Sequence, residues 1–175
     1  KHPLLYLPED HHLAYGGLEL LAAHLAEIAR TYVFPVKFRP GDLKLKALTH
    51  QKLFGRKERL PDGFRPAKPV QYPVVFQPDG KPLQTTTPGE SIQICFAGDS
   101  ILRVPDIDAG CSLSAMFCYQ TGFEVITYHR SSGARHVLNR LMREEKNLKN
   151  IRVVFMVYIA DYADRVFPYT TDKSK

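Results

Sequence analysis

Apolar positions along the chain follow two alternating patterns. Short apolar runs at residues 4–7, 92–96, 123–128 and 151–159 predict strands. Helices are predicted at about 18–30, 111–119 and 135–147, where apolar side chains recur at helical spacing. In the first helix this stripe comprises Leu18, Leu21, Ala22, Leu25, Ile28 and Ala29. Alternating strands and helices predict a mainly parallel sheet with helices on both faces, and the almost continuously apolar run 151–159 is typical of a central strand.

Residues 33–90 differ from this pattern. Nine of the 13 prolines lie between Pro35 and Pro88, and turn sequences such as Pro78-Asp79-Gly80 separate short β-like pieces at 33–38 and 72–76. We interpret this stretch as a loop-rich, partly β insertion within a single domain that spans residues 1–175.

Composition narrows the possible functions. Hydrophobic residues make up 44% of the chain, enough for a core, and no apolar run reaches the ~20 residues of a membrane span. The formal net charge is +6, but the basic residues are spread along the chain without the interleaved aromatics of a nucleic-acid module. A solvated basic surface is therefore favoured over nucleic-acid binding, which charge alone would support.

The three cysteines give no metal-binding pattern, because no CxxC or Cys/His pair has ligand spacing. Cys95 lies in an apolar run and is expected to be a small buried residue. Cys111 and Cys118 are expected on one helix, about 10 Å apart at its rise per residue, too far for a disulfide between them.

Polar clusters follow three of the predicted strands. They are Asp10-His11-His12, Gly98-Asp99-Ser100 and the segment from His129 to Gly133. Ligands of open α/β sheets bind beyond the carboxyl ends of the strands, and a parallel sheet would bring all three clusters to that edge.

Two of these clusters combine the groups of a serine nucleophile. A serine hydroxyl needs a base to remove its proton, usually a histidine that a carboxylate orients. Ser100 follows a strand, and Gly98 permits close approach of the backbone. If the next segment starts a helix, its N–H groups favour a developing oxyanion. Asp10 can orient His12 toward Ser100, although His11 is a rival for the base.

The sequence also resembles a known family. Phe96-Ala97-Gly98-Asp99-Ser100 resembles the Gly-Asp-Ser block of the SGNH (GDSL) hydrolase superfamily. The segment from Asp10 to Gly17, followed by an Ala/Leu-rich helix, resembles the Asp-x-His block of its alginate O-acetyltransferase (AlgX/AlgJ-like) branch, in which that block comes first. The resemblance implies a three-layer, flavodoxin-like α/β/α fold, a serine–histidine–aspartate triad, and transfer of acetyl groups to exopolysaccharides in the bacterial periplasm.

By this resemblance, Ser100 is the nucleophile, His12 the base and Asp10 its orienting acid. The block that usually supplies an oxyanion residue departs from the family pattern, because His129-Arg130-Ser131-Ser132 stands in place of Gly-x-Asn-Asp. The further candidates for oxyanion or substrate binding are Gly98, Arg103, Arg130, Ser131, Gly133 and Tyr162. Since the chain begins just before the Asp-x-His block, we expect either a fragment that lacks upstream strands or a shortened version of the fold.

Two functions follow from these observations. The first is a serine-dependent O-acyltransferase or esterase acting on a carbohydrate ester, with an acyl-enzyme and without metal or organic cofactor. Its partners are the acyl-ester substrate and an acetyl donor protein, and neither nucleic acid nor a membrane span is expected. The second is a catalytically silent carbohydrate-binding or scaffold module of the same fold, which the atypical third block suggests.

Overall fold

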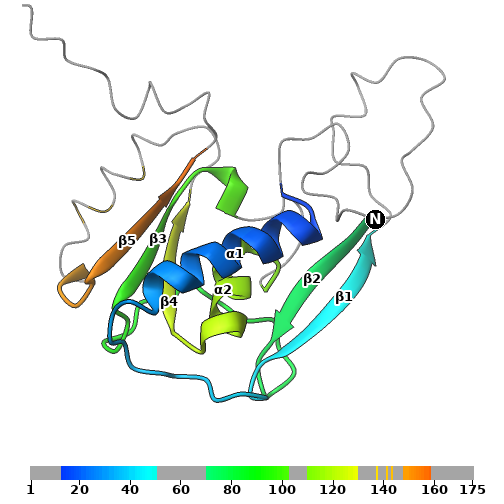
Figure 1. Ribbon diagram of the computed structural model, residues 1–175, viewed down its shortest axis with the longest axis horizontal. Helices are drawn as coiled ribbons and strands as arrows, with labels where there is room; N and C mark the ends of the chain where they lie inside the picture. The colour runs from blue at the N-terminus through cyan, green and yellow to red at the C-terminus, as the bar shows by residue number, and fades with distance from the viewer. Residues whose placement is uncertain are drawn as a thin grey trace, which may run out of the picture.

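The computed structural model describes residues 13–50, 70–102, 110–129 and 148–158, together with 137, 141 and 143. Along the chain the elements are α1 (Tyr15–Ala29), β1 (Lys44–His50), β2 (Val70–Phe76), β3 (Ile94–Gly98), the 3₁₀ turn η2 (Ser100–Leu102), α2 (Leu113–Thr121), β4 (Val125–His129) and β5 (Val153–Val157). The helices predicted at 18–30 and 111–119 and the strands predicted after residue 90 are all present, with shifted ends (Figure 1). The strand predicted at 4–7 lies outside the described residues.

Strands β3, β4 and β5 form a parallel sheet in the order β4-β3-β5, as the alternating pattern predicts. The run 151–159 was expected to be central; among the described strands β3 holds the middle position and β5 lies beside it. Every residue of β3 is buried, whereas Val154 and Met156 of β5 are 45% and 38% exposed. A continuous apolar run does not show whether a strand is central or next to the central one, because strands in both positions carry apolar side chains on two faces.

Apolar side chains of β3 project to both faces of the sheet. Ile94 and Phe96 pack into a core that α1 and α2 share. Cys95 and Ala97 belong to a second cluster on the opposite face, which also contains Val137 and other apolar side chains. Alternation along a strand produces this division, because successive side chains point to opposite faces.

Helix α1 packs on α2 along its small and apolar residues (Figure 1). Leu18, Ala22 and Ala29 of the predicted stripe are fully buried. Ile28 was assigned to the same stripe, but it is 41% exposed, and Ala26 is buried instead. The short side chain of Ala26 lets the buried face turn toward residues 22, 26 and 29, which moves Ile28 to its margin.

The two strands within residues 33–90 pair with each other and lie outside the parallel sheet. β1 and β2 are antiparallel and form a two-stranded sheet. The Val75 N–H donates to Gly110 and its carbonyl accepts from Leu83, so these groups face away from β1. Pro73, two residues earlier, presents its nitrogen to the same side and therefore removes no hydrogen bond from the ladder with β1. Side chains of β2 such as Tyr72 and Val75 nevertheless enter the core of α1 and α2. The β-like piece expected at 33–38 contributes an isolated bridge between Val36 and Phe123.

Both ends of α2 are set by local chemistry. The Ser112 hydroxyl accepts a 3.0 Å hydrogen bond from the Ala115 N–H at the start. Gly122 ends the helix in the left-handed conformation with φ of 73°, as its sequence position predicts. Cys111 lies before the helix, so its predicted place on the same helix as Cys118 was wrong. Both thiols and that of Cys95 are buried and free.

Candidate functional site

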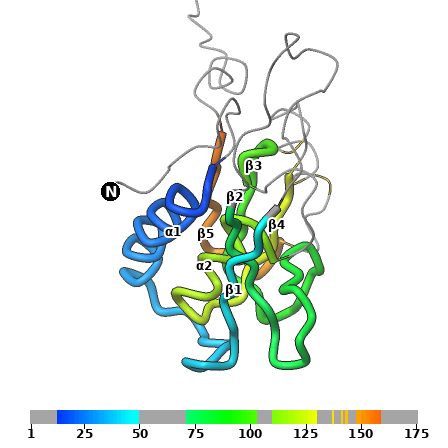
Figure 2. The backbone as a smooth tube through the Cα atoms, turned by 90° about the vertical axis from the view of Figure 1, so that its right-hand side faces the viewer, coloured from blue at the N-terminus to red at the C-terminus, as the bar shows by residue number. Residues whose placement is uncertain are grey.

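The carboxyl ends of the three parallel strands form one edge. The register pairs Gly98 at the end of β3 with His129 of β4 and with Val157 of β5. Two of the polar clusters found in the sequence, Gly98-Asp99-Ser100 and the segment that starts at His129, therefore begin at the same level. Helix α1 also starts toward this end of the molecule (Figures 1 and 2).

Ser100 lies in a tight turn directly after β3. Ser100–Leu102 form a single 3₁₀ turn, where the sequence analysis considered the start of a helix. The Leu102 N–H donates to the Asp99 carbonyl oxygen over 3.3 Å, which closes the turn. Ser100 is half-buried, and the two residues that follow it are buried. The serine is thus held on short, fixed backbone at the carboxyl end of a strand, where ligands of open α/β sheets bind.

Gly98 places this turn against β5. A Cβ atom at position 98 would overlap the Val157 carbonyl oxygen. The same carbonyl accepts a 3.4 Å hydrogen bond from the Asp99 N–H. The close approach that the sequence analysis assigned to Gly98 is therefore toward the neighbouring strand, and glycine is needed because any side chain would push β5 away.

Asp99 is the residue that sequence reasoning missed. Its carboxylate is buried, with the residue 2% exposed, and Oδ1 accepts a 2.9 Å hydrogen bond from the Ile101 N–H. An aspartate that binds the backbone two residues later is a common way to stabilise a turn. The Gly-Asp-Ser triplet contained this signal, since Asp before a strand-end turn often has this role.

Tyr158 is the first residue after β5, next to Val157, which is paired with Gly98. Its hydroxyl oxygen is buried and has no hydrogen-bond partner within the described part of the chain. Burial raises the pKa of Tyr158, and the negative charge of Asp99 raises it further. The two residues are thus electrostatic neighbours at the end of the sheet. From the sequence, Tyr158 could stack on a sugar ring, but its place at the end of an apolar strand favours a packing role.

Most of the predicted site residues lie outside the described residues. Of the triad, Ser100 is placed, whereas Asp10 and His12 are not described. The other candidates outside the described part are Arg103, Arg130, Ser131, Gly133 and Tyr162. Leu13, directly after the Asp-x-His block, is 5% exposed and belongs to the core beside α1.

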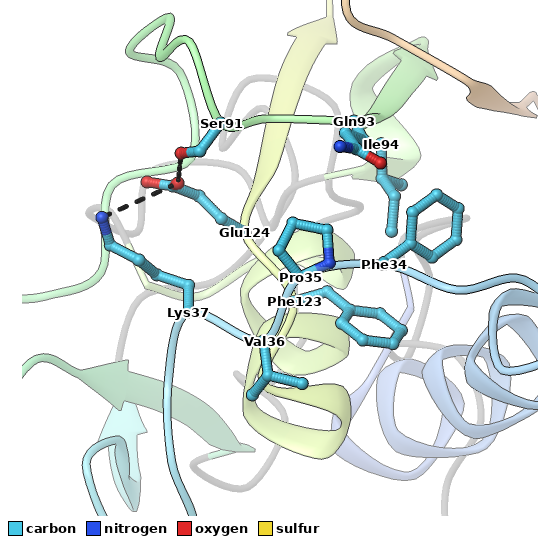
Figure 3. A pocket seen from close by; sticks show the side chains of 9 residues that line it. All are labelled: Phe34, Pro35, Val36, Lys37, Ser91, Gln93, Ile94, Phe123 and Glu124. Atoms are coloured by element: carbon cyan, nitrogen blue, oxygen red, sulfur yellow. Dashed lines mark hydrogen bonds and ion pairs between the residues drawn. The ribbon is translucent and has the colours of Figure 1, made fainter.

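A pocket of about 140 Å³ lies at the opposite edge of the sheet (Figure 3). It is lined by Phe34, Pro35, Val36, Lys37, Ser91, Gln93, Ile94, Phe123 and Glu124. The Glu124 carboxylate accepts a 2.8 Å hydrogen bond from Ser91 and lies 3.9 Å from the Lys37 ammonium, so its charge is compensated. Ile94 begins β3, which puts the whole strand between this pocket and Ser100.

Within the described ranges, no group of three or more His, Cys, Asp or Glu side chains is arranged to hold a metal ion. The helices of the same ranges include none long and apolar enough to cross a membrane.

Comparison with known proteins places this arrangement among solved structures. No protein-family model matches the chain, and no curated protein sequence matches it. The chain is similar to Pseudomonas aeruginosa AlgX, with a TM-score of 0.62 and 18% identity over 91% of this chain and 37% of that one. It is also similar to the O-acetyltransferase domain of Pseudomonas putida AlgJ, with a TM-score of 0.61 and 17% identity over 89% of this chain and 54% of that one. The likeness to AlgX and AlgJ that the two sequence blocks predict is therefore confirmed at the level of the fold, over about a third to a half of those longer chains.

Proposed function

We propose that this protein is a serine-dependent O-acyltransferase or esterase acting on a carbohydrate ester. The observation that carries the proposal is the position of Ser100, on a tight turn at the carboxyl end of the central strand β3. Its support from known proteins is a fold like that of the AlgJ O-acetyltransferase domain. We also propose that the fold is a three-layer, flavodoxin-like SGNH domain and that residues 33–90 form an insertion in it.

The proposed chemistry proceeds through an acyl-enzyme. The Ser100 oxygen forms a bond to the acyl carbon while its proton passes to His12, and Asp10 stabilises the imidazolium. The bond from the acyl carbon to the leaving oxygen then breaks, and His12 returns the proton to the departing alcohol. A sugar hydroxyl or water resolves the acyl-enzyme by the same steps in reverse, which makes the protein a transferase or a hydrolase respectively.

The roles of His12 and Asp10 rest on the sequence resemblance. So does an extracytoplasmic, periplasmic location, and so does an exopolysaccharide as the acceptor. The proposal requires neither a metal nor an organic cofactor, because serine, histidine and aspartate side chains supply the nucleophile, the base and its orienting charge.

The direct experiment measures the burst of alcohol release from a chromogenic acetyl ester. Wild type is compared with Ser100→Ala, His12→Ala and Asp10→Asn. We expect a burst with wild type, none with Ser100→Ala, and strongly slowed acylation with the other two. A burst that survives His12→Ala would move the base to His11. If wild type shows no burst with any ester, the silent carbohydrate-binding module becomes the better account.

A further inference from the structure

Three of the four backbone N–H groups from Asp99 to Leu102 donate hydrogen bonds to described residues. The Asp99 N–H donates to Val157, the Ile101 N–H to the Asp99 carboxylate, and the Leu102 N–H to the Asp99 carbonyl. Within the described residues the Ser100 N–H donates to no acceptor. The turn thus leaves one amide available beside the serine oxygen, the position from which an N–H stabilises an oxyanion.

A second hydrogen-bond donor, the Tyr158 hydroxyl, lies at the same end of the sheet. Gly98 is paired with Val157, so Tyr158 comes level with Asp99, next to the start of the Ser100 turn. Its hydroxyl is buried and makes no hydrogen bond to the described residues. An unsatisfied buried hydroxyl is destabilising and calls for an explanation. Donors aimed at a transition state have this property, because they gain their acceptor only when charge develops on the substrate.

We propose that the Tyr158 hydroxyl is the second oxyanion donor of the Ser100 site, acting together with the Ser100 N–H. The inference rests on the proposed function and assigns the position that the atypical block after β4 leaves open. As Ser100 adds to the acyl carbonyl, the electron pair of the C=O double bond moves to oxygen. Tyr158 donates a hydrogen bond to that oxygen and keeps its proton, and the bond weakens again when the carbonyl re-forms.

Electrostatics favour this use of Tyr158. Burial and the nearby Asp99 charge both raise the pKa of its hydroxyl, so the group stays protonated and remains a donor at neutral and moderately alkaline pH. Shielding from water also strengthens a hydrogen bond to a developing negative charge.

The test is Tyr158→Phe, which removes the hydroxyl and keeps the ring. The matched control is Tyr72→Phe, which removes a hydroxyl that is also buried, from a tyrosine on β2 in the two-stranded sheet. Acylation by p-nitrophenyl acetate gives the rate constant and KM, and thermal unfolding gives Tm, for both variants, wild type and Ser100→Ala. An oxyanion donor predicts about a 100- to 1,000-fold lower acylation rate for Tyr158→Phe, an unchanged KM, and a Tm equal to or above that of wild type.

Each other outcome overturns the inference in a recognisable way. If Tyr158→Phe acylates as fast as wild type while Ser100→Ala is inert, the proposed function stands and the role of Tyr158 falls. If Tyr158→Phe and Tyr72→Phe lose activity and Tm to the same extent, Tyr158 serves packing. If wild type is not acylated at all, the proposed function fails and the inference fails with it.

Discussion

Gly98 at the end of β3 lies against the carbonyl group of Val157 on β5, and no side chain fits between them. A Cβ at position 98 would overlap that oxygen and would stand 3.1 Å from a methyl group of Leu102. The contact sets the distance between two strands at the point where the Ser100 turn begins. The Ser100 turn is therefore positioned by a glycine that has no chemistry of its own.

Gly98→Ala is predicted to destabilise the protein and to disturb the turn. The added methyl group forces the ends of β3 and β5 apart, which we expect to lower the free energy of unfolding by about 1–3 kcal/mol. Urea unfolding measures the change. Gly89→Ala is the matched control, because its methyl group would meet only the Ile92 side chain, at 3.3 Å. Equal effects of the two substitutions would contradict the role assigned to Gly98.

Asp99→Ala is predicted to loosen the turn, because the buried Ile101 N–H loses its acceptor. We expect a loss of about 1–3 kcal/mol in the free energy of unfolding and slower acylation of Ser100. Asp99→Asn should recover part of both, since an amide oxygen can accept the same hydrogen bond. Thermal unfolding and the acylation burst provide the two readings. An Asp99→Ala protein as stable and as active as wild type would show that this bond does not hold the turn.

How far the sequence predicts this site depends on the kind of interaction involved. Strand–helix alternation predicts the parallel sheet, and the carboxyl ends of β3 and β4 are where the sequence analysis expected polar clusters. Both follow from patterns local to each element. The central position of β3 and the exposure of Ile28 do not, because they depend on which elements pack together.

The same distinction applies to individual site residues. The Gly-Asp-Ser triplet suggested the nucleophile, but the contact of Gly98 with Val157 joins residues 59 positions apart and is visible only in the structure. Tyr158 looked like a packing residue because its sequence neighbours are apolar. Its hydroxyl is buried at the end of the sheet and makes no hydrogen bond to the described residues, which no sequence pattern indicates.

Alkaline pH is predicted to destabilise the fold through its three buried thiols. Burial raises the pKa of Cys95, Cys111 and Cys118 from 9.0 to about 12. The unfolded chain releases these protons near pH 9.0, whereas the folded protein retains them until about pH 12. Stabilisation is therefore complete below pH 9.0 and declines as pH rises through this window.

The decline can be assigned to a particular thiol. Each cysteine contributes a slope of up to about 1.4 kcal/mol per pH unit in the free energy of unfolding. Urea unfolding under reducing conditions at a series of pH values above 9 gives this slope. Cys118→Ala should be less stable at neutral pH because it leaves a cavity. The dependence of its free energy of unfolding on pH should nevertheless be shallower, by the contribution of one cysteine. An identical slope would mean that Cys118 ionises as readily when folded as when unfolded.

The most direct test of the central claim is to find where an acetyl group becomes attached. The protein is incubated with p-nitrophenyl acetate, quenched in acid during the burst, digested, and analysed by mass spectrometry. The account predicts acetylation at Ser100 in wild type and its absence in Ser100→Ala, while acetylation of exposed lysines is equal in both. A burst with the acetyl group on another residue, or equal labelling of the two proteins, would contradict Ser100 as the nucleophile.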